Sequence, residues 1–264
     1  MYKEKTQKYD DFKLYSLKVS PLTLSLKKTK FDLFSSLNQS GFKFRENDVL
    51  VISSKYVSVS EGSVIKLDKV KVSKIARFLS SKYHIHAKMA ELTLRESDYI
   101  FGGIPGLLLA AKDGILAPNA GLDKSNVPRG SIVMYPRDPF KTAENLRRRF
   151  LVNLGIKIGV IISDSRLMPT RIGTTGVAIA CAGIEPIEDQ RGKKDLFGNI
   201  LRVTFKAVAD SLATIGVAVM GESNESRPAA VIRNLSLVHT NRKLSWQDMA
   251  IDAANDIYIR GIKL

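Results

Sequence analysis

The sequence predicts a mixed α/β fold, in which sheet strands alternate with helices along the second half of the chain. Two observations lead to this prediction. Short runs rich in β-branched residues mark strands, and amphipathic or apolar segments with helix-starting and helix-ending residues lie between them. The composition agrees with a folded protein, since 44% of the 264 residues are hydrophobic and 25% are charged.

Five segments carry the strand pattern. The strongest is IKIGVIISD at 156–164, which follows a glycine. The other predicted strands are 48–57, 130–136, 200–205 and 229–235.

Helices are predicted from their boundaries. Asp138-Pro139 begins a helix that Gly155 ends, because proline suits the first turn and glycine suits the position after the last. Segments 71–84 and 206–220 have helical spacing or a continuous apolar character. Ser245 is a suitable cap for a last amphipathic helix that runs to about residue 262.

Composition also limits the classes of protein. Cys181 is the single cysteine, so the chain has no intramolecular disulfide or cysteine-based zinc site, and a reducing, cytoplasmic setting is expected. The polar N-terminal stretch does not resemble a secretory signal, and no apolar run reaches the ~18 residues of a membrane span. The formal charge of +15 favours anionic partners such as nucleotides, acidic metabolites or nucleic acid; a solvated basic surface is the alternative.

Three segments have residues suited to metal and phosphate chemistry. Asp123 and Asn126 lie in a glycine-containing loop, Asp164 and Ser165 end the strongest strand, and Glu222 follows the apolar helix. Oxygen ligands of this kind suit Mg²⁺ or Mn²⁺ better than Zn²⁺. The alternatives are ordinary turns and helix termini, since Asn and Asp also bond to their own backbone.

The strand end at Asp164 is followed by further residues suited to anions. Arg166 and Arg171 could grip phosphate or carboxylate, because a guanidinium matches both in a bidentate manner. Gly173 and Gly176 would let backbone N–H groups approach an anion. The basic loop 191–198 is a weaker anion-site candidate, with a turn as its alternative. Neither a Walker-type loop nor a G-x-G-x-x-G fingerprint is present, so any nucleotide is held differently.

The motifs, in their order and spacing, resemble the family of coenzyme F420-0:L-glutamate ligases. The matching stretches include DVLVISSKYVSVSEG (48–62), NAGLDKSNVPRGS (119–131), IGVIISDS (158–165), GTTGVAIACAG (173–183), RGKKDLFGNILRVT (191–204) and VMGESNE (219–225). They cover most of residues 45–235.

The resemblance implies a single catalytic unit over residues 1–264, or two intertwined subdomains, with mixed sheets flanked by helices and a basic N-terminal extension at 1–20. It implies a homodimer that uses GTP, or ATP, with Mg²⁺ or Mn²⁺. An acidic acceptor is phosphorylated on its carboxylate, and the amine of L-glutamate attacks the acyl phosphate.

The resemblance also assigns roles to residues. Carried over by motif position, Asp123, Asp164, Ser165 and Glu222 are metal ligands. Asn126, Ser54 and Lys55 contact the nucleotide. All seven lie within the matching stretches.

This chain departs from the family pattern in two places. The family's Gly-Arg pair after the metal aspartate is absent from Asp164-Ser-Arg-Leu-Met168, and Val59 replaces a lysine. The pattern is closer to a sister group associated with folate-like acceptors. Three alternatives therefore stay open: a ligase for a folate- or pterin-like acceptor, a family member that binds without catalysis, and a basic nucleic-acid-binding protein.

Overall fold

A computed structural model describes residues 16–27 and 29–262. The predicted extension at 1–20 therefore lies mostly outside the described residues. Helices and sheets are mixed throughout, which confirms the predicted fold class. None of the helices described for this chain is long and apolar enough to cross a membrane.

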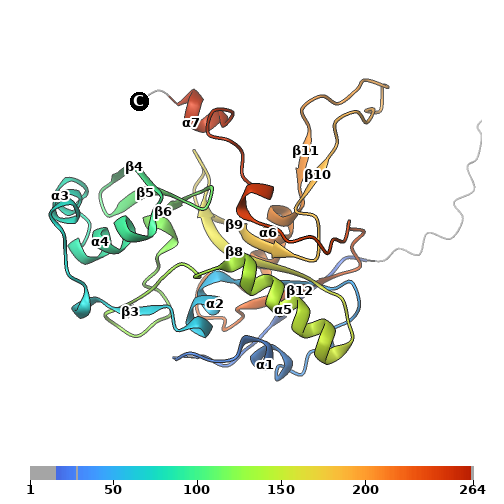
Figure 1. Cartoon of the computed structure of the whole chain (residues 1–264), viewed down its shortest axis with the longest axis horizontal. Helices are drawn as coiled ribbons and strands as arrows, with labels where there is room; N and C mark the ends of the chain where they lie inside the picture. Colours follow the sequence, from blue (N-terminus) through green and yellow to red (C-terminus); the bar gives the residue numbers. More distant parts are fainter. Residues whose placement is uncertain (1–15, 28, 263–264) are drawn as a thin grey trace, which may run out of the picture.

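A five-stranded sheet forms the centre of the protein (Figure 1). Its order is β1-β12-β2-β8-β9, and only the pair β2–β8 is parallel among these neighbours. The strands are β1 (Lys18–Leu22), β12 (Ala229–Arg233), β2 (Val49–Ser53), β8 (Gly159–Leu167) and β9 (Thr174–Ala182). Because β2 and β8 run in the same direction, their carboxyl ends meet at one edge, where the candidate site lies.

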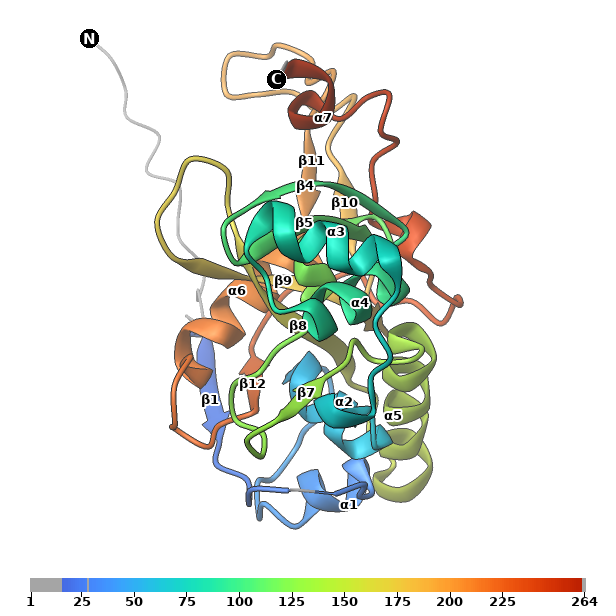
Figure 2. The same cartoon turned by 90° about the vertical axis from the view of Figure 1, so that its left-hand side faces the viewer.

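Alternation along the strands supplies two apolar cores. Leu50 and Ile52 face one side of β2, and Val49 and Val51 face the other. The first side is covered by α5 (Pro139–Leu154), together with α1 (Leu33–Asn38) and α2 (Ser54–Glu61). The second side is covered by α6 (Val208–Met220), so the central sheet is buried on both faces (Figure 2).

A smaller lobe follows α2 in the chain and has its own apolar core. It contains a three-stranded sheet, β4 (Tyr99–Ile104), β5 (Leu107–Lys112) and β6 (Ile115–Pro118), and a two-stranded pair, β3 (Val64–Lys66) and β7 (Ser131–Val133). The helical elements of the lobe are α3 (Lys74–Tyr83), α4 (Ala87–Glu96), and the single turns η1 (Leu67–Lys69) and η2 (Asn119–Gly121). Figure 1 shows this lobe beside the central sheet.

Several sequence predictions are confirmed. Helix α5 has the predicted bounds; the Asp138 side chain accepts a hydrogen bond from the Lys141 amide, and Gly155 ends the helix with φ 70°. β8, β7, β12, α3 and α6 lie within or overlap the segments predicted for them. Cys181 is buried in the second core, which raises the pKa of its thiol to about 12.

The predicted strand at 48–57 is wrong in its second half. β2 ends at Ser53, and α2 begins at Ser54 and ends at Glu61, followed by Gly62 in the left-handed conformation. Val57 and Val59 favour strands on their own, but here they are buried against the sheet and the adjoining lobe as part of a helix. Tertiary packing thus overrides the local β propensity.

The predicted strand at 200–205 is also mostly wrong. Only β11 (Phe205–Ala207) forms there, paired with β10 (Ile187–Asp189) at the base of a projecting arm (Figure 1). Val203 is 84% exposed, so this apolar run does not lie against a sheet face in the described chain. The basic loop 191–198 forms the tip, where the Asp195 carboxylate accepts hydrogen bonds from the Phe197 and Asn199 amides, which is the turn alternative.

The predicted C-terminal helix is interrupted. Ser245 caps a helical turn as predicted, in a capping box with Asp248, but the turn η3 (Trp246–Asp248) stops at once, and α7 (Ile257–Gly261) is separate. Asp252 and Asp256 accept hydrogen bonds from nearby backbone amides. Such bonds compete with helix continuation.

Candidate active site

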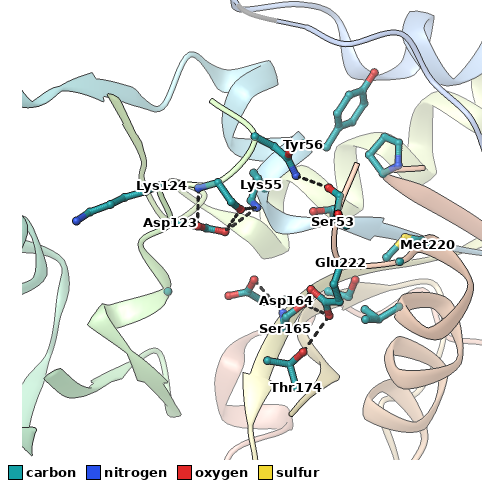
Figure 3. Close-up of a pocket in the computed structure, with 18 of the residues that line it drawn as sticks. Ser53, Lys55, Tyr56, Asp123, Lys124, Asp164, Ser165, Thr174, Met220 and Glu222 are labelled. Atoms are coloured by element: carbon teal, nitrogen blue, oxygen red, sulfur yellow. Dashed lines mark hydrogen bonds and ion pairs between the residues drawn. The ribbon is translucent and has the colours of Figure 1, made fainter. Parts of the chain in front are cut away.

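A cavity of about 670 Å³ lies between the small lobe and the central sheet. Four segments supply its polar wall: the start of α2, the loop after η2, the end of β8 and the segment after α6 (Figure 3). Lys55, Asp123, Asn126, Asp164, Ser165 and Glu222 all line it. Six predicted site residues from four distant segments are thus brought to one place.

Asp164 lies on β8 just beyond an irregularity in the pairing with β9. One carboxylate oxygen, Oδ1, accepts hydrogen bonds from Ser54 Oγ at 2.9 Å and from the Ser165 amide at 3.0 Å. Burial raises the pKa of Asp164 to about 6, and the charge of Asp123 adds to this effect. The second oxygen, Oδ2, accepts no hydrogen bond from a described residue, so it is available to a ligand.

Asp123 faces Asp164 from the small lobe. Its Oδ2 lies 2.6 Å from Lys55 Nζ, and the Ser125 amide and hydroxyl each donate to its carboxylate at 2.8 Å. Partial burial would raise the pKa of Asp123, but the Lys55 and Ser125 contacts together outweigh it and lower the pKa. Asp123 is therefore held ionised.

The two amides of the same loop have different roles. Asn119 is buried at η2, where its Oδ1 accepts a hydrogen bond from the Leu108 amide at 3.0 Å, so it serves the fold of the lobe. Asn126 has a left-handed backbone and donates from Nδ2 to the Ser223 carbonyl at 2.9 Å. This bond joins the lobe to the segment after α6 across the cavity mouth.

Glu222 lies two residues beyond the end of α6. Its carboxylate accepts hydrogen bonds from Ser165 Oγ at 2.7 and 2.9 Å and from Thr174 Oγ1 at 3.2 Å. Thr174 lines the cavity and was not among the predicted site residues, although it lies in the family-matching stretch GTTGVAIACAG (173–183).

The chemistry of this donor set fits a hard divalent cation, because it consists of carboxylate and hydroxyl oxygens. The side chains are at present bonded to protein groups: Asp123 to Lys55, Asp164 to Ser54, and Glu222 to Ser165. Within residues 16–27 and 29–262, no three acidic, histidine or cysteine side chains form a ready-made metal cluster. A cation would have to exchange with some of these partners.

Five predicted site residues do not line the cavity. Ser54 is buried, and its hydroxyl donates to Asp164 Oδ1. Arg166 lies near Asp210 on α6, where its charge opposes the rise that burial causes in the pKa of that carboxyl. Arg171 and Gly173 lie in the exposed β8–β9 turn. Gly176 faces α6 instead: a Cβ there would lie 2.4 Å from the Ala213 carbonyl oxygen.

The segment at residues 24–27 and Arg227 also line the cavity, and the sequence pattern gave no signal for either in this role. Val59, at the family's lysine position, lines it one helical turn after Lys55. Lys27, Lys124 and Arg227 have no carboxylate within ion-pair distance among the described residues. These three cations are therefore available to an anionic ligand.

The family model of F420-0:gamma-glutamyl ligase matches residues 30–234. The chain belongs to this family. Three relatives, each named coenzyme F420:L-glutamate ligase, agree over most of its length. The proteins of Methanopyrus kandleri, Archaeoglobus fulgidus and Methanothermobacter thermautotrophicus are 35%, 37% and 36% identical, over 84%, 78% and 78% of this chain and 88%, 83% and 82% of theirs.

The matched region of the F420-0:gamma-glutamyl ligase family contains every polar cavity residue from Lys55 to Glu222. It leaves out residues 24–27, which also line the cavity. This family membership, together with the cavity, supplies the basis for a functional proposal.

Proposed function

We propose that the protein is a nucleotide- and divalent-metal-dependent γ-glutamyl ligase that joins L-glutamate to an acidic acceptor of the coenzyme F420 type. Family membership supports the reaction class. The observation that carries the proposal is that carboxylates, hydroxyls and cationic side chains from distant parts of the sequence line one cavity. The cavity volume of about 670 Å³ is within the range of small-molecule sites.

The proposed reaction has two steps. A carboxylate oxygen of the acceptor attacks the terminal phosphorus of GTP or ATP, and the bond to the nucleoside diphosphate breaks. The glutamate amine then attacks the carbonyl carbon of the acyl phosphate, loses a proton, and inorganic phosphate leaves as the amide bond forms. Phosphorylation is needed because a free carboxylate is a poor electrophile. Such transfers depend mainly on positioning and charge neutralisation.

The chain's own residues would divide this work. Lys55 and Asn126 line the cavity and would position the nucleotide, with Lys55 carrying a positive charge for its phosphates. Ser54 would act through Asp164, to which its hydroxyl donates. Asp123, Asp164, Ser165 and Glu222 would hold Mg²⁺ or Mn²⁺. When bound, such a cation neutralises charge on the transferring phosphoryl group.

A single incubation tests the proposal. The protein is mixed with GTP or ATP, Mn²⁺, L-glutamate and candidate acceptors, both F420-type and folate-like, and the products are measured by mass spectrometry. The expected result is an acceptor that gains one or more glutamyl residues while the nucleotide loses its terminal phosphate. Glutamylation of the folate-like acceptor alone would show that the acceptor is folate-like and not of the F420 type.

Asp164→Ala should abolish this turnover while the melting temperature changes little, because the carboxylate contributes hydrogen bonds to Ser54 and Ser165 but no ion pair. Asp68→Ala is the control, since Asp68 is an exposed aspartate of the small lobe and lies outside the cavity. Wild-type turnover in Asp164→Ala would exclude this cavity as the active site.

We further propose that the protein works as a homodimer. The arm between β10 and β11 exposes Leu196 and Phe197 by 101% and 92%, and the β8–β9 turn exposes Ile172 fully. Large apolar side chains exposed on projecting segments are typical of association surfaces. Light scattering should give twice the chain mass, and Leu196→Asp with Phe197→Asp should give the monomer; a monomeric wild type would refute dimerisation.

A further inference from the structure

Lys55 joins the two walls of the cavity. It lies on the first turn of α2, the helix that directly follows strand β2 of the central sheet. Its ammonium contacts the loop after η2 in the small lobe. Nζ lies 2.6 Å from Asp123 Oδ2 and 2.5 Å from Ser125 Oγ (Figure 3). The Lys55 and Asp123 side chains are 25% and 44% exposed, so the contact is open to the cavity and to solvent.

The ammonium acts on both carboxylates that face each other across the cavity. Asp123 and Asp164 line the cavity from its two walls, so their negative charges repel each other. The Lys55 ammonium, bonded to Asp123 in the same cavity, offsets this repulsion. A single positive charge thus stands near two carboxylates that would otherwise destabilise one another.

A divalent cation held by the same two carboxylates would occupy the position that the Lys55 ammonium now occupies. Asp123 Oδ2 is already bonded to Lys55 Nζ and to Ser125 Oγ, so a metal ion that binds Asp123 Oδ2 must replace a donor. Two cations competing for one carboxylate cannot both keep close contact, because their charges repel.

We propose that Lys55 is a built-in counter-ion that holds the cation position between Asp123 and Asp164 in the metal-free protein and leaves Asp123 when Mg²⁺ or Mn²⁺ binds. This inference rests on the proposed function. It gives Lys55 two successive partners: the carboxylate before the metal enters, and the nucleotide phosphates afterwards. Without nucleotide, the metal affinity is lowered because the Lys55–Asp123 contact is lost on binding. With nucleotide, the phosphates give Lys55 a new partner, so this loss is compensated.

The test measures Mn²⁺ affinity without nucleotide, by electron paramagnetic resonance at fixed ionic strength. Lys55→Met keeps a side chain of similar length and removes the charge. It should bind Mn²⁺ about tenfold more tightly than the wild type, which corresponds to ~1.4 kcal/mol. Lys124→Met is the matched control: Lys124 also lines the cavity and adjoins Asp123, but its side chain extends away from that carboxylate (Figure 3). Its affinity should stay within about twofold of the wild type.

A second measurement reports the displacement directly in the wild-type protein. An amine-reactive reagent is applied with and without saturating Mn²⁺, and modification of each lysine is quantified by peptide mass spectrometry. Loss of the Asp123 contact should raise Lys55 modification several-fold, while Lys27, which lines the same cavity, should not change.

The outcomes separate this inference from the proposed function. Equal Mn²⁺ affinity in wild type and Lys55→Met, or unchanged Lys55 modification when Mn²⁺ is bound, overturns the counter-ion role and leaves the ligase proposal standing. An equal increase in Mn²⁺ affinity in Lys55→Met and Lys124→Met also overturns it, because the loss of any nearby positive charge would then explain the effect. Absence of Mn²⁺ binding by every variant, even with nucleotide present, overturns both.

Discussion

Replacing Gly176 with alanine tests whether this glycine serves helix packing or anion binding. A Cβ built at Gly176 lies 2.4 Å from the Ala213 carbonyl oxygen and 2.9 Å from the Thr214 Cα, whereas ordinary contacts begin at 3.4 Å. Both contacts are backbone atoms of α6, so no side chain can rotate aside. Relief requires α6 to move from β9 by about 1 Å.

The expected cost follows from this overlap. Overpacking of a filled core destabilises the fold by about 1–3 kcal/mol. Alanine also lowers the conformational entropy of the unfolded chain, which stabilises the fold by less than about 1 kcal/mol. A net loss of about 2 kcal/mol should lower Tm by roughly 4–8 °C for a chain of this size. Thermal unfolding followed by circular dichroism measures this shift.

Gly261→Ala is the control, because its Cβ meets only the Ile257 side chain at 3.8 Å and lies in a helix. It should leave Tm unchanged or slightly higher. If Gly176→Ala has the Tm of the wild type but binds nucleotide more weakly, the packing explanation is refuted. The anion-site prediction made from the sequence would then be supported.

Two further predictions concern ionisable groups. In metal-free protein, burial raises the pKa of Asp164 to about 6 from its ordinary 3.8, so the wild type loses stability as pH rises through this range. Asp164→Asn should therefore have the higher Tm at pH about 8 and no advantage near pH 4; an advantage independent of pH would contradict this. Glu144 accepts hydrogen bonds from the nearly buried Arg147 at 2.8 and 2.9 Å, which lower the pKa of Glu144. Glu144→Gln should lower the free energy of unfolding, measured with urea at pH 7, by about 2 kcal/mol. The difference from the wild type should shrink as pH falls below about 4, and a difference under about 0.5 kcal/mol at pH 7 would show that the pair contributes little.

Local chemistry was sufficient to predict some elements and residues. Helix α5 was predicted to its last residue because Asp138, Pro139 and Gly155 act through bonds within their own turns. β8 was predicted because its apolar run is long and buried on both faces. The oxygen-bearing residues Asp123, Asp164 and Glu222 could be selected by their type and by their position at element ends.

Other features depended on partners that the sequence does not reveal. Val57 and Val59 are helical because α2 packs against the sheet and the lobe, not because of their own preference. Arg166 follows Asp164 by two residues but does not line the cavity; it lies near enough to Asp210 on α6 for its charge to act on that carboxyl. Gly176 was assigned to an anion because glycine allows close approach, and the structure shows that the approaching group is a helix carbonyl.

By itself, the sequence determined the family, the mixed fold class, the bounds of the best-punctuated helix and the oxygen-rich character of the candidate site. Only the tertiary structure decided which of those residues share a cavity, and that Lys55 stands against Asp123 across 68 positions of chain. The physical reason is range. Capping, turns and alternation act over a few residues, whereas an ion pair or a buried carboxylate depends on distance and solvent exclusion, which exist only after distant segments have packed together.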